Sequence, residues 1–254
     1  SVCESEPMLH TYPFTEVPIG VCSVCIICRK AEKSMENTKA EVREKIKEAQ
    51  KVLIGIGKEW ALRDDEKDIR FRHLSDPAQS DLKAAYEELY QLIQDKDYYI
   101  VTTLTDGAIY EMPFDKNRIV APCGNIHWRQ CSKACTKDIW EEGEVPDDIC
   151  PHCKAPLTGN TLKAETYIEE GYLPRWKDYM KWQTGTINRS LVILELGEGF
   201  STPTVMRWPF EKIIYFNQKS KLYRINENFY QLPKEAEKRG VSVHENSVRW
   251  MLEK

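Results

Sequence analysis

The sequence predicts an α/β fold, a Rossmann-like doubly wound parallel sheet with a small module that carries two cysteine pairs. From about residue 39 onward, short and nearly continuous apolar segments alternate with helical patterns. Such segments are typical of strands that helices cover on both faces of a parallel sheet. The two close cysteine pairs interrupt this alternation near the middle of the chain. A sheet of this class binds nucleotides at the carboxyl ends of its strands.

Length and charge restrict the possible functions. The 254 residues suffice for one large domain with a substantial core. The formal net charge of −4 gives no general reason to bind nucleic acid or an anionic membrane. The longest apolar run, residues 17–27, is shorter than the roughly 20 residues of a membrane span and lacks the flanks of a secretory signal. Closely paired cysteines favour metal binding in a reducing compartment, so we expect a cytoplasmic protein.

Residues 1–34 differ from the remainder of the chain. They contain four cysteines, three prolines and no clear period, and Met35 then opens a polar helical segment. We interpret them as an atypical N-terminal segment, a leader or a tail, and residues 35–254 as the folded domain. An iron–sulfur motif is the alternative, because residues 22–28 place three cysteines at C-x2-C-x2-C spacing. A cluster held by four cysteines needs one more ligand.

Two helices and three strands are predicted in the first half of the domain. Apolar residues recur at helical spacing from about Lys39 to Ala49, which predicts the first helix. Ser80 is suited to cap a second helix, whose apolar period extends to Ile93. Short runs rich in β-branched and aromatic residues predict strands at 52–54, 98–102 and 118–120.

The second half continues the alternation. The amphipathic stretch 172–182 predicts a helix, and its tryptophans belong either to a core-facing surface or to the wall of a groove. Apolar runs predict strands at 190–194, 213–216 and 222–225, and a helix closes the chain at 245–252.

Four cysteines have the spacing of a zinc site. Cys131 and Cys135 form one pair, Cys150 and Cys153 form the other, and a polar segment separates them. Zinc prefers a closed tetrahedron of thiolates, which two close pairs provide once a loop joins them. The alternative is four free or core cysteines, but two such pairs rarely arise by chance. We therefore predict structural zinc in a zinc-binding module at about 126–165, with the neighbouring His152 as a minor alternative ligand.

The order of these motifs resembles the sirtuin family over about residues 39–254. Sirtuins have a glycine-rich turn after the first strand, as at 55–57 here. Their Thr-Gln-Asn-Ile-Asp-Gly motif is similar to 102–107, and their His-Gly step, about eight residues before the first zinc cysteine, corresponds to 123–124. A Gly-Thr-Ser turn and an Ile-Asn step have counterparts at 194–203 and 224–226.

The resemblance implies binding of NAD and cleavage of its nicotinamide. Glycines after the first strand would let the backbone approach the pyrophosphate. Asp106 either contacts nicotinamide or ribose, or is the turn residue of an Asp-Gly step. The cofactor-binding residues implied are Gly55, Gly57, Thr103, Asp106, Gly197, Gly199 and Asn226.

Several positions depart from the family's pattern. Leu104 replaces the nicotinamide-pocket Asn, Cys123 replaces the catalytic His, and residues 69–72 are only a loose counterpart of the Gly-Ile-Pro-Asp-Phe-Arg loop. The candidate catalytic residues are Cys123 and Asp106. Cys123 is either a base, if nearby charge lowers its pKa, or an inert buried thiol, and His127 is a weaker candidate for the missing imidazole.

Glu195 and Glu198 are unusual beside the glycines of a phosphate-facing loop, since like charges repel. Glu198 therefore points away from the phosphate, or contacts a ribose hydroxyl or the acceptor.

The chain most resembles divergent bacterial sirtuins linked to macrodomain proteins, in which the catalytic histidine is also replaced. This resemblance implies an NAD-dependent transferase that acts on a protein side chain by mono-ADP-ribosylation or lysine deacylation. The implied partner is a protein substrate, with a lipoyl-carrier or macrodomain-associated protein as candidate, and neither nucleic acid nor membrane. Two alternatives are a catalytically silent NAD-binding sensor and a zinc-stabilised interaction module that binds no nucleotide.

Overall fold

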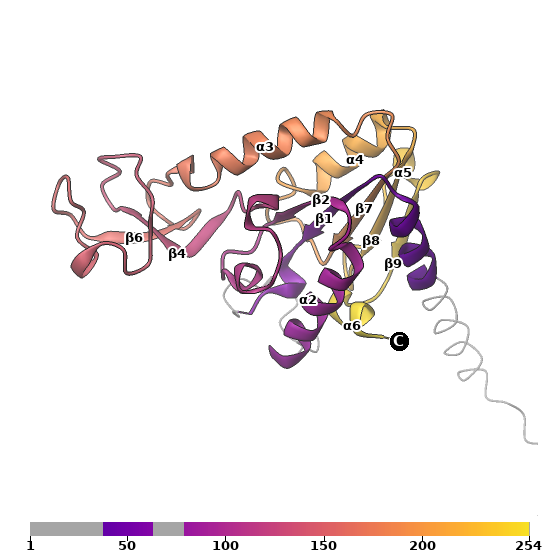
Figure 1. Ribbon diagram of the computed structural model, residues 1–254, viewed down its shortest axis with the longest axis horizontal. Helices are drawn as coiled ribbons and strands as arrows, with labels where there is room; N and C mark the ends of the chain where they lie inside the picture. The colour runs from indigo at the N-terminus through magenta and orange to yellow at the C-terminus, as the bar shows by residue number, and fades with distance from the viewer. Residues whose placement is uncertain (1–37, 63–78, 254) are drawn as a thin grey trace, which may run out of the picture. The chain divides into compact units, whose positions relative to one another are not determined.

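The computed structural model describes residues 38–62 and 79–253 (Figure 1). The interpretation of residues 1–34, including the iron–sulfur alternative, and the loop counterpart at 69–72 lie outside the described residues. Within the two described ranges, every helix is too short or too polar to cross a bilayer.

Six parallel strands form the larger sheet, in the order β3-β2-β1-β7-β8-β9. The order reverses between β1 and β7, which is the switch point of a doubly wound sheet. This arrangement confirms the predicted Rossmann-like fold. The strands are β1 (Lys51–Ile56), β2 (Asp97–Thr102), β3 (Ile119–Val120), β7 (Leu191–Leu196), β8 (Ser220–Ile225) and β9 (Gly240–Val243).

Helices cover both faces of this sheet (Figure 1). Side chains alternate along a strand, so Val52 and Ile54 of β1 pack on one face and Leu53 packs on the other. The first face is covered by a helix at 38–48, α2 (Gln79–Ile93) and α6 (Ser247–Leu252). The second is covered by α3 (Leu173–Thr184), α4 (Arg207–Phe216) and α5 (Lys234–Glu237).

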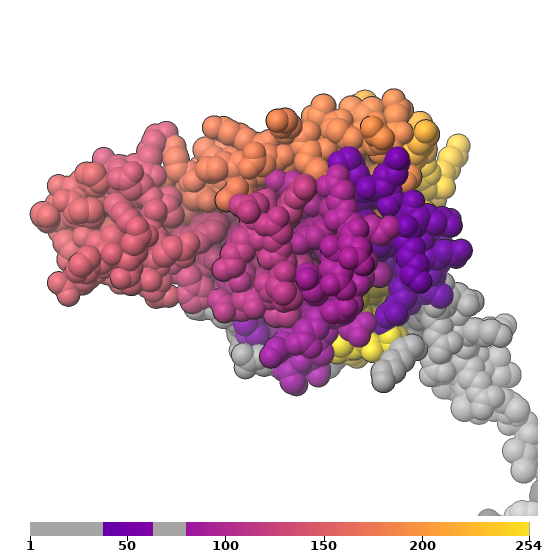
Figure 2. Space-filling view, in the orientation of Figure 1, coloured from indigo at the N-terminus to yellow at the C-terminus, as the bar shows by residue number. Residues whose placement is uncertain are grey.

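A small antiparallel sheet lies between β3 and α3 in the chain. Its order is β5-β4-β6, and its strands are β4 (Gly124–Cys131), β5 (Trp140–Glu141) and β6 (Leu157–Thr161). In the space-filling view the pink surface of this module adjoins the orange surface at the start of α3 (Figure 2). The 3₁₀ turns are η1 (Lys58–Trp60), η3 (Ala108–Glu111), η4 (Lys116–Arg118), η5 (Pro146–Asp148) and η6 (Glu169–Gly171).

The predicted strand at 213–216 is wrong, because these residues end α4. Phe210, Ile213 and Ile214 face the sheet at helical spacing, whereas Phe216 is 74% exposed. A four-residue apolar run fits a buried strand and one side of a helix equally well.

Three smaller differences concern other elements. Ser80 is not the cap of α2, since the helix already includes Gln79. The strand β9 and the antiparallel sheet were not predicted.

In α3, Tyr179 and Trp182 are buried against Tyr99 of β2, which confirms the core-facing interpretation of this helix.

Candidate functional site

The carboxyl ends of β1, β2 and β7 meet at one edge of the larger sheet. The Gly57 amide donates to the Leu196 carbonyl at 2.8 Å, and the Thr103 amide donates to the Ile56 carbonyl at 3.2 Å. The Thr103 hydroxyl donates to Oε2 of Glu198 at 2.6 Å. The structure therefore brings together the three loops in which the sequence places a dinucleotide.

Two of the predicted glycines allow close packing within this junction. A Cβ on Gly57 would lie 2.3 Å from the Cα of Glu198. Gly197 has a φ of +67°, and a Cβ there would lie 2.5 Å from the Cβ of Glu59. Both positions require glycine for contacts inside the protein, whatever they contribute to a ligand.

Other predicted cofactor residues hold the loops themselves. Gly55 lies inside β1, which extends to Ile56, and the space of its missing side chain is taken by Met206. The side-chain Nδ2 of Asn226 donates to the carbonyl of Glu198 at 2.8 Å, and its Oδ1 accepts from the backbone amides two and three residues further on. Their contacts with a nucleotide stay predictions, as do those of Thr103 and Gly199.

Two carboxyl groups at this edge have raised pKa values. Glu59 accepts from the amide and hydroxyl of Ser247, at 2.7 and 2.6 Å, and from the Glu227 amide at 2.7 Å. Burial nevertheless raises the pKa of Glu59 to about 7. Burial raises the pKa of the fully enclosed Glu198 to about 8, against the opposing hydrogen bond from Thr103. The sequence drew attention to Glu198 but not to Glu59.

Asp106 organises the turn after β2. Its Oδ1 accepts from the Ala108 amide at 3.0 Å, and its Oδ2 accepts from the Leu62 amide at 2.8 Å. Gly107 follows with a φ of +78°. This geometry agrees with the Asp-Gly turn role, and a catalytic role stays a prediction. Leu104 is buried in the core beside this turn, with 3% of its surface exposed.

Cys123 lies buried between β3 and β4, next to aromatic residues. The rings of Tyr167 and Tyr172 stack with centroids 6.2 Å apart, and the Tyr167 hydroxyl donates to the carbonyl of Pro122 at 3.0 Å. Burial raises the pKa of both tyrosines, and the hydrogen bond to Glu169 adds to the rise at Tyr172, whose pKa is about 12. Neither tyrosine is therefore a base at neutral pH.

His127 does not share this buried environment. Its side chain is 52% exposed, and its Nδ1 lies 2.6 Å from Oε2 of Glu142. This exposed position agrees with a surface role for His127.

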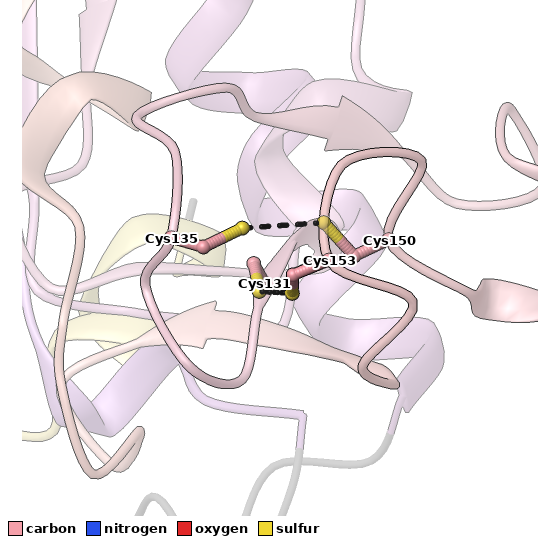
Figure 3. A group of neighbouring side chains, drawn as sticks. All are labelled: Cys131, Cys135, Cys150 and Cys153. Atoms are coloured by element: carbon pink, nitrogen blue, oxygen red, sulfur yellow. Dashed lines mark hydrogen bonds between the residues drawn. The ribbon is translucent and has the colours of Figure 1, made fainter.

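The four predicted zinc ligands converge in the small module (Figure 3). The sulfurs of Cys131 and Cys153 are 3.4 Å apart, those of Cys135 and Cys150 are 3.6 Å apart, and all four lie within 4.8 Å of one another. Zinc–sulfur bonds of about 2.3 Å in a tetrahedron imply sulfur separations of about 3.8 Å. The donor set fits a closed structural zinc site.

Tight turns position these thiols. The Ala134 amide donates to the carbonyl of Cys131 at 2.9 Å, and the Lys154 amide to that of Cys150 at 3.0 Å. Ala134 and Lys154 have φ values of 48° and 63°, in the left-handed region. His152 lies outside the four-thiol group, with its Nε2 2.8 Å from a carboxylate oxygen of the module.

Comparison with known proteins adds two distant relatives in sequence. No protein-family model matches the chain. The chain is 24% identical over 183 residues to a protein ADP-ribosyltransferase of Staphylococcus aureus, a match that covers 64% of this chain and 57% of that protein. It is 22% identical over 201 residues to a probable bifunctional ADP-ribose hydrolase/ADP-ribosyltransferase of Fusarium oxysporum f. sp. cubense, covering 68% of this chain and 33% of that protein. The chain thus spans about half of the first relative and a third of the second.

Solved structures share the fold. A Sir2 homologue in complex with NAD superposes with a TM-score of 0.57 at 12% identity, covering 84% of this chain and 90% of that one. A mutant Sir2 homologue in complex with ADP-ribose gives 0.52 at 14% identity, covering 83% and 92%. The chain therefore has a Sir2-like fold.

Proposed function

We propose that this chain is a sirtuin-like, NAD-dependent transferase that moves ADP-ribose onto a protein side chain and releases nicotinamide. The observation that carries the proposal is the hydrogen-bonded junction of Gly57, Thr103 and Glu198 at the switch point of the sheet. Parallel sheets of this type bind dinucleotides at that point. The Sir2-like fold, shared with a homologue solved in complex with NAD, supports an NAD site. The names of the two curated relatives favour ADP-ribosylation over lysine deacylation.

In this proposal NAD lies across the loops that follow β1, β2 and β7. NAD supplies the glycosidic bond that is cleaved when a nucleophile of the acceptor attacks its ribose. The protein contributes position and electrostatic stabilisation. Asp106 lies at the nicotinamide or ribose, and Cys123, once ionised to its thiolate, accepts the nucleophile's proton. The protein substrate is a lipoyl-carrier or macrodomain-associated protein. The name of the Fusarium relative also includes an ADP-ribose hydrolase, which supports a functional link between this chain and proteins that act on ADP-ribose.

A silent NAD sensor is the second candidate, and two observations favour it. Leu104 is buried and apolar where the family has an amide. Both carboxylate oxygens of Asp106 accept backbone amides of neighbouring turns. If these groups serve only structure, the site binds NAD without breaking it.

Two measurements test the proposal. Calorimetric titration with ADP-ribose and NAD measures binding, and nicotinamide release in the presence of candidate acceptors measures turnover. Binding together with release supports the transferase, and binding without release supports the sensor. Absence of binding at millimolar NAD contradicts both and leaves a zinc-stabilised interaction module.

Replacement of Cys123 tests its assigned role. A general base contributes about 10²–10⁴-fold to rate, so we expect Cys123→Ala to slow nicotinamide release at least about 100-fold. The affinity for NAD should change little, because the thiol acts on the acceptor's proton. Thermal unfolding of the variant checks that the buried site is intact. An unchanged rate would show that this thiol is not the base.

A further inference from the structure

The outer side of α4 carries large apolar side chains that are exposed. Trp208, Tyr215 and Phe216 share one side of the helix at i, i+7 and i+8 spacing, opposite the side that packs on the sheet. Their exposed fractions are 47%, 58% and 74%, and the rings of Tyr215 and Phe216 meet edge to face with centroids 5.1 Å apart. A helix that is apolar on opposite sides is typical of one that packs on two partners. This second side also makes the apolar run at 213–216 continuous.

The exposed apolar surface continues onto the loop after α3, which lies beside the end of α4 (Figure 1). The side-chain Nδ2 of Asn217 donates to the carbonyls of Thr186 and Arg189, at 2.9 and 3.1 Å, and so holds this loop against α4. Within the loop, Ile187 is 58% exposed. Single exposed apolar residues are ordinary, but a contiguous group of them marks an interaction site. The group is called the α4 face below and consists of Ile187, Trp208, Tyr215 and Phe216.

Basic residues surround the α4 face without carboxylates to balance them. Residues 173–189 and 207–219 contain seven basic and two acidic residues, in a chain whose net charge is −4. Both acidic residues are engaged, one with Arg175 at 3.6 Å and the other with Arg224 at 2.8 Å. The neighbouring segment 234–238 has two residues of each sign. Several exposed cations form no salt bridge with any carboxylate that the structure describes, among them Lys181, Arg189, Lys212 and Lys219.

We propose that the α4 face is a docking surface for a partner protein that presents carboxylates around apolar side chains. The apolar residues supply the contact area, and the unpaired cations select the sign of the partner's charge. Lys212 lies between Trp208 and Tyr215 on the helix, so a carboxylate of the partner can pair with it while apolar side chains cover the rings.

Charge also decides against two other occupants. A two-fold contact with a second copy of the chain places the same patch against itself, and the cations of the α4 face would then oppose like charges. An anionic membrane fits less well because Lys212 lies within the apolar stripe. Insertion of that stripe would carry the ammonium group toward the hydrocarbon, which is costly.

The α4 face lies away from the proposed dinucleotide site. Arg207 begins α4 beside the strand ends, where it donates to the Glu198 carbonyl at 3.0 Å. Phe216 ends α4 shortly before Ser220 opens β8, at the opposite edge of the sheet. A partner on this surface leaves the strand ends open, so the inference goes beyond the proposed function and does not depend on it.

The test is titration of the whole chain with two synthetic helical peptides, followed by fluorescence anisotropy. Each peptide has about five helical turns with leucine along one side, and the flanking positions carry glutamate in one peptide and lysine in the other. We expect the glutamate peptide to bind at least about tenfold more tightly, although the net charge of −4 favours the opposite order. Its affinity should fall as salt is raised, since exposed charges are screened.

Two variants and two matched controls locate the binding. Phe216→Ser removes an apolar contact and Lys212→Glu reverses a charge, so each should weaken the glutamate peptide at least about tenfold. Both side chains are exposed, and thermal unfolding should match that of the native chain. Leu162→Ser changes a side chain that is 51% exposed beside β6, and Lys83→Glu reverses an exposed charge on α2. These controls should keep the native affinity.

Each outcome supports or overturns the docking surface. Preference for the glutamate peptide that both variants weaken and both controls retain supports it. Equal affinity for the two peptides, or no binding at about 1 mM, overturns it. Sedimentation that shows a dimer of the native chain, dissociated by Phe216→Ser, assigns the surface to a second copy instead. Binding to phosphatidylserine–phosphatidylcholine vesicles that Phe216→Ser abolishes assigns it to a membrane, and also overturns the proposal.

Discussion

At the scale of single residues, Glu59 shows burial and hydrogen bonding acting against each other. Three donors from Ser247 and Glu227 favour its carboxylate form, but burial favours the neutral acid and raises its pKa to about 7 from an ordinary 4.5. Between these two values the native state binds more protons than the unfolded state. The stabilisation from this group is therefore complete below about pH 4.5 and is lost as the pH rises through about 7.

We expect the free energy of unfolding to decline from pH 5 to pH 8, with roughly 3 kcal/mol of the decline due to Glu59. Glu198 adds to the same trend, because its pKa is raised as well. Urea denaturation at the two pH values should give a smaller decline for Glu59→Gln than for the native chain. Glu48→Gln, at an exposed carboxyl group, should leave the decline unchanged. Equal declines in all three proteins would contradict the assignment.

At the scale of elements, Gly124 determines how the antiparallel module begins. It starts β4 with a φ of +88°, and a Cβ there would lie 2.1 Å from the Asn160 carbonyl of β6. Gly143 has a similar φ of +81° but nothing within 4 Å of a Cβ. Both glycines have a left-handed backbone that would strain any other residue, and they differ in the space available for a side chain.

Alanine at each glycine separates these two effects. Gly143→Ala should lower the free energy of unfolding by about 1–2 kcal/mol, the cost of a left-handed conformation. Gly124→Ala should lower it by about 3 kcal/mol or more, since the β4–β6 pairing must also shift. Chemical denaturation of both variants measures the difference. Equal losses would mean that the module adjusts to the added methyl group without cost.

At the scale of the whole molecule, the two sheets depend on different sources of stability. The six-stranded sheet is buried between two helical layers, whereas the apolar core of the small module consists mainly of Cys131, Cys150 and Ala155. So small a core is typical of modules that a metal stabilises, because metal binding supplies the folding free energy.

Cys150→Ser should therefore release zinc and unfold the module while the larger sheet persists. Metal analysis should find the ion lost, and hydrogen exchange should show protection lost at 124–161 but kept in β7. Cys123→Ala is the control, because this buried cysteine lies outside the four-thiol group and should retain zinc. Retained metal in Cys150→Ser, or unfolding of both sheets together, would contradict this independence.

Local patterns in the sequence were enough to determine five of the six parallel strands, all but β9, and the four converging thiols. Both depend on spacing within a few residues, namely the run of apolar residues in a strand and the separation of the two cysteines in each pair. The tertiary structure alone decided that 213–216 belongs to a helix, since that depends on which face meets the sheet. It also decided that Glu59 meets Ser247 and that Glu198 stands buried against Gly57. The ionisation of these carboxyl groups depends on burial and on partners from distant parts of the chain, Ser247 for Glu59 and Thr103 for Glu198, which no local pattern encodes.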